Sequence, residues 1–107
     1  MPSAVIVSAA RTAVATARKG TLANTSAETL ALAVLKEVVT RSGVAPDSVD
    51  DVILAESLYG GGAVARHAAV EAGMTKAGGM ALNRHCAGSL TSVGLAEIGR
   101  ASCRERV

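Results

Sequence analysis

The pattern of apolar and polar residues changes several times along the chain, and each change marks a different expected element. Three short apolar runs predict strands, at residues 4–8, 52–55 and 80–83. The first of them contains the β-branched sequence VIV. The second does not alternate with polar residues, so that strand is expected to be buried on both faces.

Apolar residues three or four positions apart predict helices between these strands. The clearest set lies on one helical face and consists of Leu30, Val34, Leu35 and Val38. The capping-box sequence TSAE predicts Thr25 as the N-cap of this helix, with Glu28 reaching back to it. Gly43 is expected to end the helix in the left-handed conformation. A second helix is expected over residues 63–72 before Gly73, and a third follows the last strand.

This order, β-α-β-α-β-α, predicts an α/β fold with a parallel sheet and right-handed crossovers. A length of 107 residues is enough for one small domain. Tyr59 is the only aromatic residue, so the core must be built from aliphatic side chains and methionine. A chain this short buries a modest fraction of its surface, and its stability without a partner surface is expected to be low.

The N-terminal segment has two possible interpretations. Residues 1–27 contain no acidic residue but include Arg11, Arg18 and Lys19, a composition compatible with a transit peptide. The β-branched run favours the alternative, a first strand followed by a polar loop. Because there is no secretory pattern, we expect a mature cytoplasmic N-terminus. No apolar run approaches the roughly eighteen residues that a membrane-spanning helix needs, so no membrane partner is expected.

The charge distribution argues against nucleic-acid binding. Eight basic and eight acidic side chains lie in residues 1–97, so the formal net charge of +2 comes entirely from residues 98–107. Without a basic face there is no electrostatic footprint for a phosphate backbone.

Three further patterns do not predict a site. The glycines at 60–62 follow a strand and precede a helix, as phosphate loops do, but they lack a Lys-Ser/Thr ending and a hinge is the better interpretation. Cys86 and Cys103 are not expected to form a disulfide in a chain with no secretory signal. His67, His85 and the cysteines lack zinc-type spacing, so we expect no metal and no bound cofactor.

Cys86 is the main candidate for chemistry. It follows the third apolar run and precedes small residues, which predicts a tight turn at the start of a helix. The unpaired N–H groups and positive dipole there favour the thiolate, which is the nucleophile. The alternative is a buried cysteine that only packs at the junction. His85 is adjacent, but neighbours at a strand end point in opposite directions, so it is expected to face away from Cys86.

The sequence NRHCAGSL at residues 83–90 resembles the nucleophile motif of the thiolases, the family of acetyl-CoA C-acetyltransferases and 3-ketoacyl-CoA thiolases. AVIVSAART at residues 4–12 is similar to the family's first strand and the Arg-Thr turn after it. ARHAA at residues 65–69 resembles the helix before the nucleophile strand. Ala13 and Gly88 stand where the family usually has proline and serine, which leaves subfamily and substrate open.

The resemblance implies a covalent acyl transfer. Cys86 would attack the 3-keto carbonyl of a 3-ketoacyl-CoA, release acetyl-CoA and pass the acyl group to free CoA; the reverse is a Claisen condensation. Coenzyme A is then a substrate, and the backbone N–H of Cys86 is a candidate oxyanion donor. The family's activating histidine, second cysteine and asparagine-held water come later in the full-length enzyme. The resemblance also implies a homodimer or homotetramer, and a chain that is inactive alone.

Residues 98–107, IGRASCRERV, look like the in-frame translation of a common sequencing adapter. Gly99 and three arginines break the small-apolar pattern that precedes them. We therefore expect a partial thiolase N-terminal domain over residues 1–97 and a non-native tail over residues 98–107; the alternative is a genuine basic C-terminus. A different functional hypothesis is a free-standing α/β interaction or regulatory module, in which Cys86 is structural or redox-active.

Overall fold

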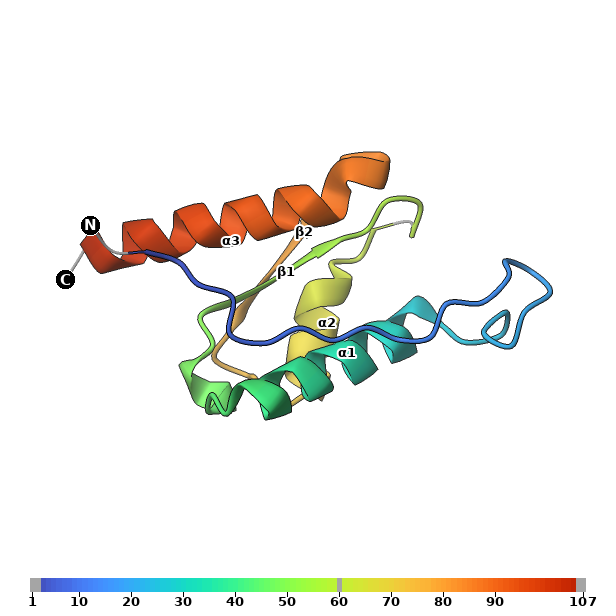
Figure 1. Cartoon of the computed structure of the whole chain (residues 1–107), viewed down its shortest axis with the longest axis horizontal. Helices are drawn as coiled ribbons and strands as arrows, with labels where there is room; N and C mark the ends of the chain where they lie inside the picture. Colours follow the sequence, from blue (N-terminus) through green and yellow to red (C-terminus); the bar gives the residue numbers. More distant parts are fainter. Residues whose placement is uncertain (1–2, 60, 106–107) are drawn as a thin grey trace.

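The computed structural model describes residues 3–59 and 61–105, and it arranges them as an α/β unit (Figure 1). Three α-helices, two strands and two short 3-10 helices are found within these ranges. In chain order they are α1 (Ala27–Ser42), η1 (Pro46–Ser48), β1 (Asp51–Ala55), α2 (Val64–Glu71), β2 (Gly78–Leu82), η2 (His85–Ala87) and α3 (Gly88–Glu105).

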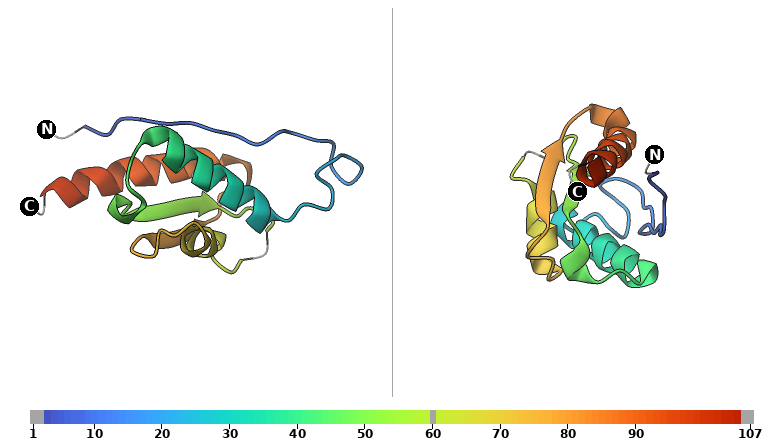
Figure 2. Two further views of the ribbon diagram at one scale, coloured as in Figure 1. Left: turned by 90° about the horizontal axis from the view of Figure 1, so that it is seen from below. Right: turned by 90° about the vertical axis from the view of Figure 1, so that its left-hand side faces the viewer.

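The two strands form a parallel pair, as expected for a β-α-β unit. Asp51 lies opposite Gly78 at one end of the pair, and Ala55 lies opposite Leu82 at the other. Helix α2 packs on one face of the sheet with α1 beside it, while α3 packs against β1 from the opposite side (Figure 2). The carboxyl ends of both strands therefore meet at one edge, from which the chain enters the loop before α2 and the turn before α3.

The core lies between the sheet and the two helices on its first face. Its buried members are Val52, Ala65, Ala69, Met74 and Ala77. Leu35 and Val39 of α1 cover this cluster from outside. Small side chains let α2 approach the sheet closely: a Cβ built on Gly79 would lie 2.4 Å from the Cα of Arg66. Only glycine fits at that position of β2.

The predicted helices α1 and α2 are confirmed, with one correction at a cap. The N-cap of α1 is Ser26, whose Oγ accepts a hydrogen bond from the Thr29 N–H at 3.1 Å, so the prediction of Thr25 was wrong by one residue. The Thr25 N–H, which Glu28 was predicted to bind, donates instead to the Leu22 carbonyl at 3.0 Å. The Glu28 carboxylate accepts a hydrogen bond from the Tyr59 hydroxyl. Gly43 ends the helix with φ 72°, as predicted.

The strand predicted at residues 52–55 is present, but it is less buried than expected. Val52 is buried, whereas Ile53, Leu54 and Ala55 are half-buried. Within the described residues β1 has a neighbouring strand on one side only. The open edge lets solvent reach the flank of β1, so its side chains are only partly covered although α2 and α3 both contact the strand.

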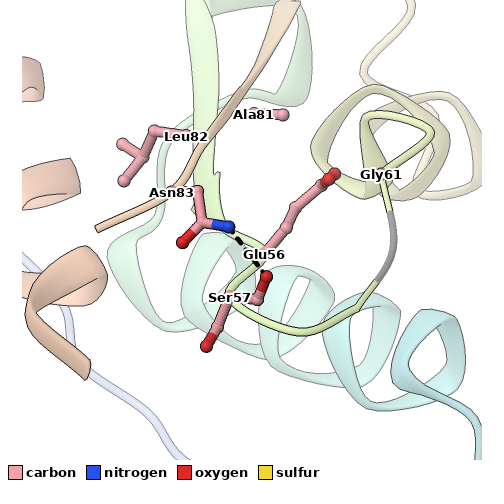
Figure 3. Close-up of a pocket in the computed structure, with 6 residues that line it drawn as sticks. All are labelled: Glu56, Ser57, Gly61, Ala81, Leu82 and Asn83. Carbon is pink, nitrogen blue, oxygen red and sulfur yellow. Dashed lines mark hydrogen bonds between the residues drawn. The ribbon is translucent and has the colours of Figure 1, made fainter. Parts of the chain in front are cut away.

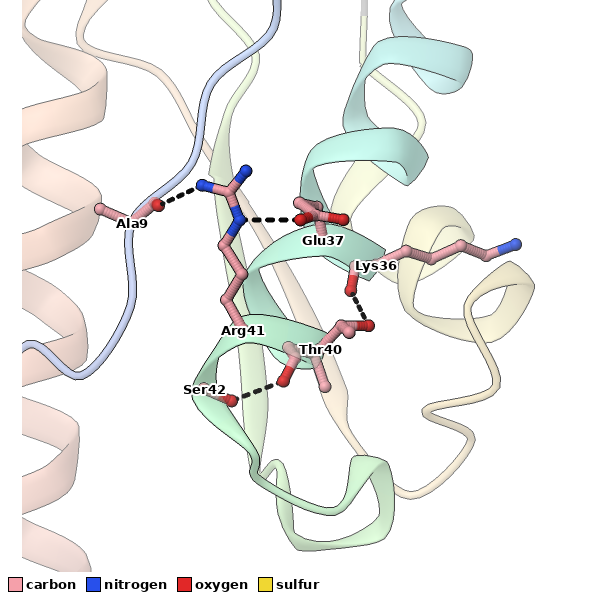
Figure 4. A network of polar contacts seen from close by, with 7 residues as sticks. Ala9, Lys36, Glu37, Thr40, Arg41 and Ser42 are labelled. Atoms are coloured by element: carbon pink, nitrogen blue, oxygen red, sulfur yellow. Dashed lines mark hydrogen bonds and ion pairs between the residues drawn. The ribbon is translucent and has the colours of Figure 1, made fainter.

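The first strand, predicted at residues 4–8, is absent from the sheet. The backbone over residues 3–16 forms no strand, and Val5, Ile6 and Val7 are 76%, 82% and 66% exposed. This segment runs past α1, where Arg41 donates to the carbonyl of Ala9 at 3.4 Å and is itself paired with Glu37 (Figure 4). A β-branched run forms a strand only when another strand supplies its hydrogen-bond partners, and none does so here.

Helix α3 continues to Glu105, through most of the segment expected to be non-native. Helical hydrogen bonds there follow from local backbone geometry and do not test the origin of that segment. None of the helices in the described part of the chain has both the length and the apolar character needed to cross a membrane.

Candidate active site

Cys86 lies in the 3-10 turn η2, between the carboxyl end of β2 and the first turn of α3. Its side chain is free and exposed. The alternative interpretation, a buried cysteine that packs at the strand–helix junction, is therefore wrong for this structure. In parallel α/β sheets, ligands bind outside the carboxyl ends of the strands, and Cys86 occupies that place.

The backbone of the turn is held in an unusual conformation. His85 has φ 45°, and its N–H donates to the Asn83 side-chain oxygen at 2.8 Å. The Ala87 N–H donates to the carbonyl of Arg84 at 3.0 Å. Among the residues that the structure describes, the N–H of Cys86 has no such acceptor. The turn thus presents a thiol and a backbone donor from the same residue.

Helix α3 begins in direct contact with the end of β1. Gly88 is buried, and a Cβ built on it would lie 2.7 Å from the Cβ of Ala55. One turn further on, the Thr91 hydroxyl donates to the carbonyl of Ala87 at 3.0 Å. The close approach of Gly88 to Ala55 fixes the start of α3 against the sheet, and with it the place where Cys86 emerges.

An open pocket of about 410 Å³ lies beside this turn, at the carboxyl ends of both strands (Figure 3). Its lining residues are Glu56, Ser57, Gly61, Ala81, Leu82 and Asn83. Glu56 accepts a hydrogen bond from the Val64 N–H at 2.7 Å, which anchors the start of α2. Asn83 donates to the carbonyl of Ser57 at 2.9 Å. Cys86 does not line the pocket; Asn83 connects the two because it also binds the backbone of η2.

Glu28 and Tyr59 form a second polar contact away from the turn. The hydrogen bond from the Tyr59 hydroxyl lowers the pKa of the Glu28 carboxyl, and the same bond raises the pKa of Tyr59. It ties the loop after β1 to the first turn of α1. We assign this pair a structural role.

The other candidates from the sequence do not join Cys86 in a site. His67 lies exposed on α2, and the Arg66 guanidinium donates to the carbonyl of Ala77 at 2.7 Å, which links α2 to the chain before β2. Gly61 and Gly62 have φ 97° and 91°, backbone conformations that favour glycine, while Gly60 lies outside the described residues. Residues 3–59 and 61–105 contain no cluster of three or more histidine, cysteine or acidic side chains that could hold a metal ion.

Sequence reasoning missed two residues that organise this edge of the sheet, Asn83 and Glu56. An asparagine two residues before His85 is the pattern of an Asx turn, and that signal was available. Glu56 follows β1 directly, but its partner Val64 is eight positions away, so only the folded loop reveals the contact.

Known proteins resemble this chain in sequence. Residues 4–99 match the model of the family described as thiolase, N-terminal domain. The chain belongs to the thiolase family. It is 40% identical over 99 residues to the acetyl-CoA acetyltransferase of Cupriavidus necator, covering 90% of this chain and 25% of that protein. Identity to the acetyl-CoA acetyltransferase of Rhizobium meliloti is 43% over 99 residues, covering 88% and 24%.

Solved thiolase structures share the fold. A thiolase from Ascaris suum in complex with coenzyme A superposes with a TM-score of 0.81 at 25% identity, over 91% of this chain and 26% of that one. The acetyl-CoA acetyltransferase from Syntrophomonas wolfei gives a TM-score of 0.79 at 25% identity, over 90% and 26%. This chain thus spans about a quarter of the length of its thiolase relatives.

Proposed function

We propose that this chain is the N-terminal part of a thiolase-type acyltransferase in which Cys86 is the nucleophile. The enzyme would cleave 3-ketoacyl-CoA with free CoA, or condense two acyl units in reverse, as part of fatty acid metabolism in the cytoplasm. The observation that carries the proposal is the exposed Cys86 on a strained turn, within a thiolase motif at the carboxyl edge of the sheet.

The reaction would proceed in two balanced steps. The Cys86 thiolate attacks C3 of the 3-ketoacyl-CoA, and the oxyanion that forms is stabilised by the Cys86 N–H. As the carbonyl reforms, the C2–C3 bond breaks, and C2 leaves with the electron pair and takes a proton from the acid/base cysteine that the resemblance places later in the enzyme, which gives acetyl-CoA; the thiol of the incoming CoA returns that proton to the cysteine. The thiolate of free CoA then attacks the acyl-cysteine and expels the Cys86 thiolate.

Within residues 3–59 and 61–105, Cys86 is offered as the nucleophile, and no hydrogen bond joins its thiol to a basic side chain. The family resemblance puts the activating histidine, the acid/base cysteine and most CoA contacts in later parts of the enzyme. A homodimer or homotetramer would complete the protein, with acyl-CoA as its substrate. We therefore expect the 107-residue chain by itself to show no thiolysis.

A hybrid enzyme tests this proposal. Residues 4–97 replace the matching segment of the Cupriavidus necator acetyltransferase, and thiolysis of acetoacetyl-CoA is followed. We expect the hybrid to turn over and to show an acetyl group on Cys86 by mass spectrometry. Cys86→Ala should lower kcat by a factor on the order of 10³ or more, with an unchanged circular dichroism spectrum. If the Cys86→Ala hybrid retains thiolysis, the nucleophile assignment is wrong.

Residues 98–107, the C-terminal tail, carry a separate proposal about the gene. We propose that residues 98–107 do not belong to the natural protein and that Cys103 has no function. Re-sequencing the locus from an independent library tests this. Recovery of the same ten codons followed by a stop would show that the tail is genuine.

A further inference from the structure

Three non-glycine residues near the carboxyl edge of the sheet have left-handed backbone conformations. Ser57, Ala63 and His85 have φ 50°, 53° and 45°. Such conformations are costly for residues with a Cβ and persist only where surrounding contacts hold them. They belong to the loop after β1, the start of α2 and the cysteine turn. These segments come together only in the folded chain.

Asn83 holds two of these three residues with one side chain. Its Oδ1 accepts from the His85 N–H at 2.8 Å. Its Nδ2 donates to the Ser57 carbonyl at 2.9 Å, the bond drawn in Figure 3. An amide has both an acceptor and a donor, so it can serve both partners at once. An aspartate lacks the donor, a serine is too short to reach Ser57 as well, and an alanine has neither group.

We propose that Asn83 is a positioning residue for Cys86, and that its amide fixes the turn in the geometry the reaction needs. This inference rests on the proposed function. Cys86 follows His85 directly, so a change of φ at His85 would rotate both the thiol and the Cys86 N–H. The bond to Ser57 sets the turn against the neighbouring strand, which fixes the turn relative to the pocket.

The consequence is a specific kinetic signature. Misplacing a catalytic group by about 1 Å can cost on the order of 100-fold in rate. Asn83→Ala in the hybrid enzyme should therefore lower kcat by about 10- to 100-fold, while KM changes by less than about 2-fold. Here kcat is the rate divided by the concentration of Cys86 thiol that can be titrated. Asn83→Ser retains an acceptor for the His85 N–H and should lose less, about 3- to 10-fold.

Ser42→Ala is the matched control. Ser42 also makes two hydrogen bonds, donating to the Val39 carbonyl and accepting from the Val44 N–H, but it lies at the far end of α1. It should cost comparable stability and leave kcat per titrated Cys86 unchanged. A general loss of folding would instead affect Ser42→Ala and Asn83→Ala alike.

Hydrogen exchange gives a readout that does not need activity. In the hybrid, the peptide containing His85 should exchange more slowly than the same peptide in Asn83→Ala, and Asn83→Ser should lie between them. Equal exchange in all three proteins would overturn the proposal. The proposal would also be overturned if Cys86→Ala is inactive but Asn83→Ala has a kcat within 2-fold of that of the unsubstituted hybrid. An active Cys86→Ala variant would instead overturn the nucleophile assignment, so the two failures are distinguishable.

Discussion

Two apolar regions of this molecule differ in how far they are covered. Around α2 the apolar side chains are enclosed: Ala65, Ala68 and Ala69 have no exposed surface, and Met74 is 1% exposed. In the N-terminal segment and on the outer face of α3 the apolar side chains face solvent. Ile6 is 82% exposed and Leu90 is 80% exposed.

The difference lies in what each region has to pack against. Helix α2 connects two strands that pair with each other, so its apolar face meets the sheet within one β-α-β unit. The N-terminal run needs a neighbouring strand, and the outer face of α3 needs another layer, and the described residues supply neither. Clusters of exposed apolar residues of this kind mark surfaces that other chain segments or partners cover.

The largest expected difference in the free energy of unfolding is between substitutions of a buried and of an exposed apolar residue. Met74→Ala removes a side chain from the enclosed core and should lower the free energy of unfolding by about 2–5 kcal/mol. Leu90→Ala should change it by less than about 0.5 kcal/mol, because most of the Leu90 side chain is already in solvent. Urea denaturation followed by circular dichroism measures both. Equal losses would contradict the contrast between the two regions.

The next largest difference in stability between the two regions is expected from glycine substitutions. Gly79→Ala places a Cβ against the backbone of Arg66 and should destabilise the protein by about 1–3 kcal/mol. Gly94→Ala in α3 meets nothing within 4 Å and should instead stabilise it by up to about 1 kcal/mol, because alanine favours the helix. The same denaturation experiment applies, and a stabilising Gly79→Ala would show that α2 does not approach β2 so closely.

The uncovered region should make the isolated chain self-associate at micromolar concentration. Exposed β-branched residues and an open strand edge both promote association. Ile6→Lys should shift sedimentation towards monomer, whereas Thr16→Lys adds the same charge outside the apolar run and should shift it less. A parent chain that sediments as a monomer at micromolar concentration would contradict this prediction.

The smallest expected effect concerns the Glu28–Tyr59 contact. Because the pKa of Glu28 is lowered from 4.5 in the folded chain, its contribution to stability is present above that value and lost as pH falls through the lowered pKa. The pKa of Tyr59 is raised from 10.0, so its contribution is lost only as pH rises through the higher value. Tyr59→Phe should be slightly less stable than the parent at pH 7, with the difference shrinking below pH 4. Thermal melts across this range measure it.

Most of the local structure could be predicted from the sequence. The apolar spacing in α1, the left-handed cap at Gly43 and the run in β1 are local patterns, and each is confirmed. The N-cap was misplaced because Thr25 and Ser26 are both good capping residues, and only the folded turn decides between them. The motif around Cys86 indicated a turn before a helix, which the structure also shows.

The order of the three helices and the two paired strands, the family, and the choice of Cys86 as expected nucleophile all follow from patterns of neighbours along the chain. Tertiary structure alone decided that the VIV run stays outside the sheet and that Asn83 links two left-handed segments. A strand needs hydrogen-bond partners from elsewhere in the chain, and a side-chain clamp needs two backbone groups brought together by folding. Ser57 and Asn83 are 26 positions apart, and only the pairing of β1 with β2 brings them within 2.9 Å.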